Sequence, residues 1–196
     1  MNSRYSDIIL PVAEPKTVAS TRVEMSEVME PQHANFVGKI FGGTILSLVD
    51  LCAYATSSRF AGGICVTASV DRVDFHNPID VGELVSLVGH VTYVGRTSVE
   101  TTIEVFAENI FTGVKRHTNT ARVTMVALDE NERPREVPRL VCETREDKLR
   151  FLEGRLRREL RTKQREERER VFAGFREASD EELDQLMAAE SLLHLL

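Results

Sequence analysis

One segment constrains the fold of this chain more than any other, the run GTILSLVDLCAYATSSRFAGG at residues 43–63. Its apolar residues recur at helical spacing and are Ile45, Leu48, Val49, Cys52 and Ala53, with Leu46 and Leu51 added. Gly62 and Gly63 end the pattern. A helix that is apolar nearly all round has to be surrounded by other structure. The sequence therefore predicts a central helix with the rest of the domain wrapped around it.

Segments with β-type patterning lie before and after the predicted helix. A weaker candidate covers residues 20–29, and four stronger ones cover residues 64–75, 83–94, 98–111 and 115–129. In the segment 98–111, Val99, Ile103 and Val105 share one face of a regular alternation. The short turns NPIDVG, GR and TG join the last four segments, so neighbouring strands should pair antiparallel. We expect an α+β fold made of a strand, a buried helix and an antiparallel meander.

Length and charge narrow the possible classes of protein. The 196 residues can bury one core and carry a small extension, but not two full-size enzyme domains. A net charge of −6 gives no overall reason to bind nucleic acid or an anionic membrane. The chain has no run of about 18 apolar residues, and its start lacks the parts of a signal peptide. We expect a cytoplasmic protein that partners neither nucleic acid nor membrane.

The last quarter of the chain differs in character. After Pro134 and Pro138, residues 143–177 are dense in Arg and Glu, with leucines at helical spacing. The predicted organisation is an N-terminal arm (1–19), a core domain (20–140) and a charged C-terminal helical extension (141–196). Two interpretations of the helix are open: a solvated helix laced with ion pairs, or a helix whose basic side, in residues 155–170, meets ligand phosphates.

Asp50 is the first candidate for chemistry, because it stands inside the apolar run ILSLVDLCA. Burying an ionised carboxylate is costly unless the group is paired, hydrogen-bonded or beside a cavity. The residues three and four positions away are Leu46, Ser47, Ala53 and Tyr54, which do not suggest an exposed face. We interpret Asp50 as a functional residue. The alternative is a solvent-facing position on the helix.

The predicted start of the helix supplies a second candidate. Gly42 and Gly43 would let a ligand approach the unpaired amides of the first turn, where the helix dipole favours negative charge. This predicts an oxyanion hole near Gly43; the alternative is an ordinary turn. Asp50 lies about 10 Å from Gly43 along a helix axis, whereas catalytic contacts span about 3 Å. If both act on one carbonyl group, they come from different subunits, as two antiparallel central helices in a dimer would allow.

Other catalytic arrangements lack support in the sequence. The G-x-S-x-G elbow of serine esterases is absent. The five histidines show no metal-ligand spacing, and neither H-E-x-x-H nor Cys-x-x-Cys occurs. Cys52, Cys65 and Cys142 stand at unrelated spacings, which predicts reduced structural thiols. The sequence implies neither a metal ion nor a bound cofactor.

Several motifs together resemble one family. The runs HANFVGKIFGGTILSLVDLCAYA, VTASVDRVDFHNPIDVGE, VGRTSVETTIEVF and TARVTMVALDENERPREVP are similar, in order and separation, to those of hotdog-fold acyl-CoA hydrolases. The resemblance covers roughly residues 20–140. It implies an antiparallel sheet wrapped around a long helix, and dimers with sites at the subunit interface. It also implies further assembly, usually into a trimer of dimers, which is a hexamer.

The resemblance implies roles for individual residues. Asn35, in the loop before the glycines, and Asp50 match the family's catalytic pair, which opposite subunits contribute. The positions that match the family's coenzyme A contacts are Ala68, Ser69 and Val70, and Arg96, Thr97 and Ser98. In some relatives a basic stretch of the tail touches the nucleotide, which adds Arg157 and Arg158 as candidates. Residues beyond 165 have no counterpart that we can assign.

The expected activity is hydrolysis of fatty acyl-CoA to free fatty acid and coenzyme A, which is part of the substrate and not a cofactor. Amides near Gly43 would stabilise the oxyanion. Asp50 would act as general base or nucleophile, while Asn35 orients water or substrate. A hotdog dehydratase would use an Asp and a His close together in the sequence. It is disfavoured, because no histidine follows Asp50 until His76. The alternative from another class is a non-catalytic acyl-CoA sensor whose tail signals to a partner. No helix-turn-helix segment precedes the fold, so the sequence gives no support to a sensor that regulates DNA.

Overall fold

The computed structural model describes residues 14–75, 77–192 and 195. The chain divides into two compact units, Met1–Leu152 and Glu153–Leu196. Most of the predicted N-terminal arm, residues 1–13, lies outside the described residues. The described part of the arm contains the strand β1 (Lys16–Thr17) and the 3-10 helix η1 (Ala19–Thr21).

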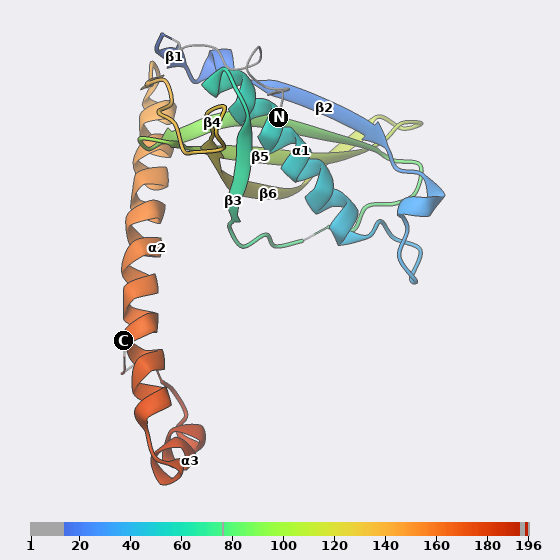
Figure 1. The fold of residues 1–196 in the computed structure, drawn as a ribbon. Coiled ribbons are helices and arrows are strands. Elements are labelled where there is room, and N and C mark those ends of the chain that lie inside the picture. The colour runs from blue at the N-terminus through green and yellow to red at the C-terminus, as the bar shows by residue number, and fades with distance from the viewer. Residues whose placement is uncertain (1–13, 76, 193–194, 196) are drawn as a thin grey trace. The chain divides into compact units, whose positions relative to one another are not determined.

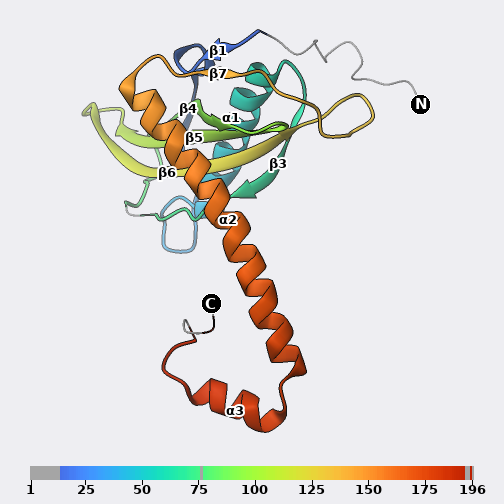
Figure 2. The ribbon, with the colours of Figure 1, turned by 90° about the vertical axis from the view of Figure 1, so that its left-hand side faces the viewer.

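A five-stranded antiparallel sheet forms the body of the first unit (Figure 1). Its strands are β2 (Val23–Val28), β3 (Cys65–Val70), β4 (Leu84–Val94), β5 (Ser98–Asn109) and β6 (Val114–Ala127), in the order β2-β4-β5-β6-β3. The helix α1 (Gly42–Ala61) lies across one face of the sheet, and Figure 2 shows it on the far side of the strands. The expected α+β fold with a central helix is confirmed.

The predicted pairing of all sequential strands is wrong at one place. β3 pairs with β6 at the far edge of the sheet and not with β4. The connection from Val70 to Leu84 is longer than a turn, and residues 79–80 within it are held at the start of α1: Ile40 N donates to Ile79 O at 2.9 Å, and Lys39 forms a β-bridge with Asp80. This attachment carries the chain from one edge of the sheet towards the other before β4 begins.

The core lies between α1 and the inner face of the sheet. Val99, Ile103 and Val105 are fully buried there, as the alternation of β5 predicts. Gly89 on β4 lets the helix approach closely, since a Cβ atom at this position would stand 2.5 Å from Thr56 Oγ1. Among the described residues nothing covers the other side of α1, where Leu51 is 51% and Tyr54 44% exposed, so the sheet surrounds the helix on one side only.

Two thiols belong to this core. Cys52 and Cys65 are free and buried. Burial raises the pKa of the Cys52 thiol to about 11 and also raises the pKa of Cys65. Both thiols therefore stay protonated and act as small hydrophobic residues. The third cysteine, Cys142, is free and partly exposed.

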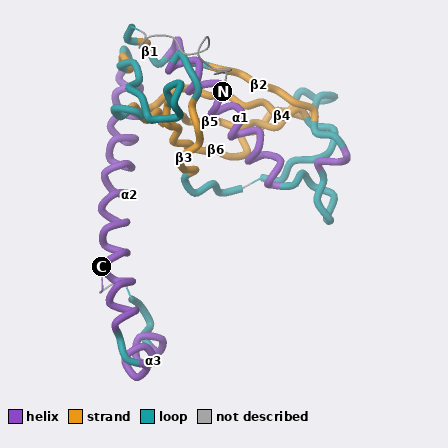
Figure 3. Tube along the Cα trace, viewed as in Figure 1, coloured by secondary structure: helices purple, strands orange, loops and turns teal. Residues whose placement is uncertain are grey.

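Small elements that the sequence did not predict complete the first unit. β1 pairs in parallel with β7 (Leu140–Val141), and the 3-10 helix η2 (Pro31–His33) precedes the Asn35 loop. Each has only two or three residues, too few for a period of two or of 3.6 to be recognised. The tube in Figure 3 shows how much loop surrounds these pieces.

The charged extension is helical, as predicted. α2 (Arg145–Glu177) begins in the first unit and continues into the second, which also holds α3 (Asp180–Ala188). In the second unit, ion pairs one helical turn apart, such as Arg155–Glu159 at 2.9 Å, lie along α2. A capping box at Ser179 begins α3, which we did not predict. In the described part of the chain, no helix combines the length and apolar character that crossing a bilayer requires.

Candidate active site

Asp50 stands on the open side of α1, half-buried. Its Oδ1 accepts a hydrogen bond of 2.6 Å from Thr67 Oγ1 on the edge strand β3. Leu46, Ser47 and Tyr54, which flank Asp50 on the helix, are exposed. The expectation that this face is not exposed is therefore wrong for one chain. β3 is the edge strand of the sheet, and nothing in the described chain covers the helix beyond it.

Thr67 is the one close partner of Asp50 that sequence reasoning missed. It precedes the predicted coenzyme A positions 68–70 by one residue and lies 17 residues after Asp50. The contact depends on how β3 is placed beside α1, and that placement follows from the pairing of β3 with β6. A polar residue in the middle of a strand following the helix is the only signal that the sequence offers.

Asn35 organises the loop before α1. Its Oδ1 accepts from Val37 N at 3.0 Å and from Lys39 N at 3.2 Å, and its own N donates to Lys39 O at 2.7 Å. The loop therefore folds back on itself around the Asn35 side chain. Phe36 and Val37 at its tip are strongly exposed. An open groove of about 630 Å³ runs from this loop to Phe41 and Thr44 at the helix start.

The start of α1 has no side-chain cap. Phe41 occupies the N-cap and supplies no side-chain acceptor for the first amides. A Cβ atom at position 43 would stand 2.2 Å from the Phe41 ring, so glycine lets this ring lie against the first turn. The amides of the first turn and the helix dipole together favour an oxyanion there. The predicted role of Gly43 remains a prediction.

Within one chain the structure does not bring Asn35 and Asp50 together. The groove beside Asn35 ends at Thr44. α1 begins at Gly42, one residue earlier than predicted, so Asp50 lies about 12 Å further along its axis. The predicted site therefore falls into two parts: Asn35 with the start of α1, and Asp50 further along the helix.

The candidate coenzyme A positions form two groups on the sheet. Ala68, Ser69 and Val70 follow Thr67 on the open edge of β3, with a register shift between Thr67 and Ser69. Arg96, Thr97 and Ser98 form the turn from β4 to β5. Ser98 pairs with Val126, whereas Ser69 and Val70 pair with Thr124 and Val123, so the two groups lie two to three residues apart along β6.

Arg96 is available for a ligand, since its side chain is 80% exposed and its Nη1 stands 3.8 Å from Glu136 Oε1. Such an exposed pair contributes little stability. Arg157 and Arg158 belong to the second unit, where Arg157 Nη1 lies 3.7 Å from Glu153 Oε2. The structure thus leaves their predicted contact with the nucleotide untested.

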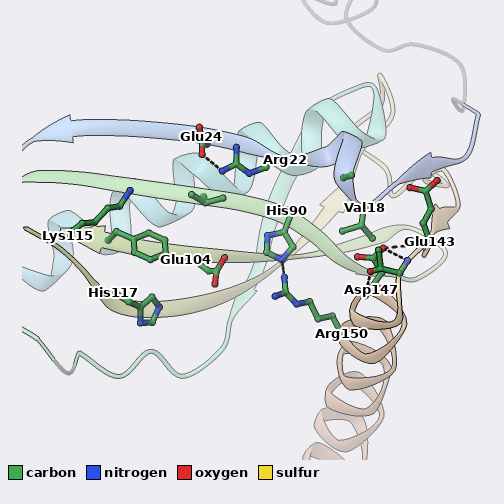
Figure 4. Close-up of a pocket in the computed structure, with 14 residues that line it drawn as sticks. Val18, Arg22, Glu24, His90, Glu104, Lys115, His117, Glu143, Asp147 and Arg150 are labelled. Atoms are coloured by element: carbon green, nitrogen blue, oxygen red, sulfur yellow. Dashed lines mark hydrogen bonds and ion pairs between the residues drawn. The ribbon is translucent and has the colours of Figure 1, made fainter. Parts of the chain in front are cut away.

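A second cavity, of about 710 Å³, lies on the outer face of the sheet and contains none of these residues (Figure 4). His90 on β4 is buried there, and its Nε2 stands 2.7 Å from Nη1 of Arg150, near the start of α2. Burial, and then the neighbouring Arg150, lower the pKa of His90. Acidic and basic side chains are mixed around this cavity, which gives it no clear preference for one charge.

Comparison with known proteins places the chain in a family. The model of the thioesterase superfamily matches residues 37–113. Helicobacter pylori protein VdlD is 41% identical over 148 residues, which cover 75% of this chain and 84% of that protein. A Bacillus subtilis protein described as an uncharacterized acyl-CoA thioester hydrolase is 38% identical over 134 residues, covering 68% of this chain and 74% of that one.

Solved structures agree. A hexameric acyl-CoA thioesterase without ligand superposes with a TM-score of 0.74 at 36% identity, covering 78% of this chain and 97% of that one. Acyl-CoA hydrolase from Staphylococcus aureus, solved with butyryl coenzyme A and coenzyme A, gives a TM-score of 0.72 at 29% identity over 82% of this chain and 98% of its own. Variants of that enzyme with one aspartate, one asparagine or one threonine replaced by alanine have also been solved.

The curled antiparallel sheet around α1 and the polar residues on its open side thus define a hotdog-fold protein, as the resemblance implied. The chain belongs to the acyl-CoA hydrolases of the thioesterase superfamily, and it is accordingly a hydrolase.

Proposed function

We propose that this hydrolase cleaves acyl-CoA thioesters with Asp50 as its catalytic carboxylate, held in place by Thr67. The carrying observation is the 2.6 Å hydrogen bond between these side chains on an exposed face of α1. The residues replaced in the Staphylococcus aureus variants support it: their asparagine, aspartate and threonine have the same separations along the chain as Asn35, Asp50 and Thr67.

The proposed site is completed by a second copy of the chain. Around Asp50 the open face of α1 exposes Leu46, Leu51 and Tyr54, and the neighbouring edge strand exposes Val66 and Val70. Contiguous apolar surface of this kind usually marks an interface. An antiparallel α1 from a two-fold related copy would cover it and bring the partner's helix start and Asn35 loop to Asp50. Hexameric relatives support such assembly, and a trimer of dimers is the form we propose.

The proposed mechanism needs one base and a polarised carbonyl. Amides at the start of α1 hydrogen-bond the thioester oxygen and stabilise the oxyanion. Asp50 takes a proton from water, the resulting hydroxide adds to the carbonyl carbon, and the carbon–sulfur bond breaks as the thiolate is protonated. Direct attack by Asp50, giving an anhydride that water then opens, is the other route. Neither route uses a metal ion or a bound cofactor.

We assign recognition of the coenzyme A part to the two groups of candidate positions on the sheet. Ala68, Ser69 and Val70 offer an open strand edge for the pantetheine amides. Arg96, Thr97 and Ser98 offer a cation and hydroxyl groups for phosphate oxygens. Arg157 and Arg158 are proposed as further phosphate contacts. The proposed location of the protein is the cytoplasm.

The test is a thiol-release assay with acyl-CoAs of several chain lengths. Asp50→Asn and Asn35→Ala should each lower kcat by about 100-fold. Glu130→Gln, which changes an exposed carboxylate beyond β6, serves as the control and should keep the native rate. A native protein that binds acyl-CoA but releases no thiol would be the non-catalytic sensor, and full activity of Asp50→Asn would refute the proposed role of this carboxylate.

A further inference from the structure

The ion pair between Arg116 and Glu83 has no part in the mechanism described so far. Arg116 on β6 meets Glu83, the residue before β4, through two parallel bonds, Nη1 to Oε1 at 2.6 Å and Nη2 to Oε2 at 2.7 Å. The Glu83 side chain is only 8% exposed. The hydrogen bonds from Arg116 lower the pKa of Glu83, and Glu83 raises the pKa of Arg116, so both groups stay charged. Such a two-pronged pair fixes orientation as well as distance.

The same pair holds the loop over residues 77–83 at several points. Arg116 Nη2 also donates to Pro78 O at 2.7 Å. Glu83 Oε2 accepts from Asp80 N at 2.8 Å, and Gly82 N donates to Met29 O at 2.7 Å. This loop contains little regular structure, so its shape depends on these polar contacts.

The Asn35 loop rests on residues 77–83. Lys39 forms an isolated β-bridge and an ion pair with Asp80, and Ile40 N donates to Ile79 O at 2.9 Å. Lys39 is also the residue whose backbone N–H and C=O hold Asn35. Gly42, where α1 begins, lies two residues after Ile40. A displacement of Asp80 would therefore be transmitted to Asn35 and to the amides at the helix start.

We infer that the Glu83–Arg116 ion pair is a positioning device for the active site, which sets the place of Asn35 and of the helix start through Asp80 and Lys39. The inference rests on the proposed function, in which Asn35 and these amides act on the thioester. Glu83 and Arg116 touch neither substrate nor reacting atoms. Their effect is expected in the rate of the chemical step, because misplacing a catalytic group by about 1 Å can cost up to 100-fold in rate.

Two conservative variants keep the fold while loosening the pair. Glu83→Gln retains the shape and the acceptor for Asp80 N but loses the charge. Arg116→Lys retains the charge but cannot form two parallel bonds or reach Pro78 O as well. Each should lower kcat about tenfold with KM changed less than about threefold. Arg22→Gln, which breaks the ion pair with Glu24 on β2, is the matched control and should leave both constants unchanged.

Coupling to Asn35 separates positioning from general destabilisation. In an Asn35→Ala background, Arg116→Lys should lower kcat less than it does in the native protein, since one of the groups that it positions is gone. Hydrogen exchange gives a readout independent of activity: the Val37 and Lys39 amides, which donate to Asn35, should exchange faster in Arg116→Lys than in Arg22→Gln.

The outcomes are distinguishable. An equal loss of kcat with and without Asn35 would overturn the inference and make the pair a structural element only, as would unchanged exchange at Val37 and Lys39. Full activity of Asn35→Ala would instead refute the role of Asn35 in the proposed function, and with it the target of the positioning. Loss of activity in Asn35→Ala with native kcat in both pair variants would leave the proposed function standing and overturn the inference alone.

Discussion

At the scale of single residues, the hydrogen bond from Thr67 to Asp50 can be tested directly. Thr67→Val keeps the shape of the side chain but removes the donor, so Asp50 loses the contact that fixes its orientation. We expect kcat to fall about tenfold with little change in KM. Thiol release under saturating acyl-CoA measures this. Thr67→Ser keeps a hydroxyl and should retain most of the rate; a Val variant as active as the native protein would mean that the contact has no catalytic role.

His90 makes a prediction about stability and pH. Arg150 is always a donor, so His90 Nε2 accepts at 2.7 Å and the ring is neutral in the folded protein. Its pKa is lowered from 6.5 by burial first and by Arg150 second. The unfolded chain therefore binds this proton more readily, and stability should fall as the pH drops below 6.5 towards the folded value.

The measurement is urea unfolding between about pH 7.5 and pH 5.5. His90→Gln can still accept from Arg150 but does not titrate, so its free energy of unfolding should change less over this range than that of the native protein. The pKa values of Glu83 and Asp147 are lowered, so their contributions to the stability of the protein are lost only at more acidic pH. His117→Gln is the control on the same face of the sheet. Parallel profiles for the native protein and His90→Gln would rule out a contribution of His90.

Residue identity alone predicted some of this and not the rest. Asp50 is conspicuous because an acid in an apolar helix requires a reason, but the expectation that its face of the helix is not exposed is wrong for a single chain. Thr67 could not be recognised, because threonine is ordinary in a strand and its partner is set by the position of β3 beside α1. The contact of His90 with Arg150 could not be predicted, since the two residues are 60 positions apart and no local pattern links them.

At the scale of elements, the C-terminus of α1 depends on residues from distant segments. Lys16 on β1 donates from Nζ to Arg59 O and Phe60 O, both at 2.9 Å, and Arg135 Nη2 donates to Ala61 O at 2.5 Å. These groups satisfy last-turn carbonyls and place positive charge at the negative end of the helix dipole. The N-terminal strand is thereby attached to the end of the central helix.

Lys16→Met should lower the free energy of unfolding by about 1 kcal/mol, because two acceptors at the helix end lose a charged donor while the apolar stem is kept. Urea denaturation of the native and variant proteins measures the difference. Lys163→Met, on an exposed part of α2, is the control and should be neutral within about 0.5 kcal/mol. Equal stability of native protein and Lys16→Met would show that water serves these carbonyls equally well.

Elements with a strong period were predictable, and their connections were less so. The run of apolar residues gave α1 within one residue of its observed start, and the alternation of β5 gave its buried face. The predicted pairing of β3 is wrong, because the sequence predicts a strand over residues 64–75 and a short turn at NPIDVG, whereas β3 ends at Val70 and Asp80 forms an isolated β-bridge with Lys39. β1, β7 and α3 had too little length or pattern to be identified.

At the scale of the whole molecule, the main prediction concerns which chain supplies which catalytic group. Asn35 lies in the loop before α1 and Asp50 lies eight residues after Gly42, where the helix begins; the open face of this helix carries apolar residues that need a cover. If two copies pair through that face, each site combines Asn35 of one copy with Asp50 of the other. Asn35→Ala and Asp50→Ala would then lose nearly all activity for the same reason, since each leaves every site of its own homodimer with one group missing.

Mixing the two inactive variants tests this arrangement. After unfolding and refolding together, a dimer with one copy of each variant holds one site with both groups intact and one site with neither. Random pairing at equal amounts should restore about a quarter of the native activity per chain. Each variant refolded alone is the control and should stay inactive. If Asn35 and Asp50 of the same chain formed the site, mixing the variants could not restore it. A mixture no more active than its components would therefore show that the two residues do not share a site between subunits. Recovered activity would establish the dimer and the shared site in one measurement.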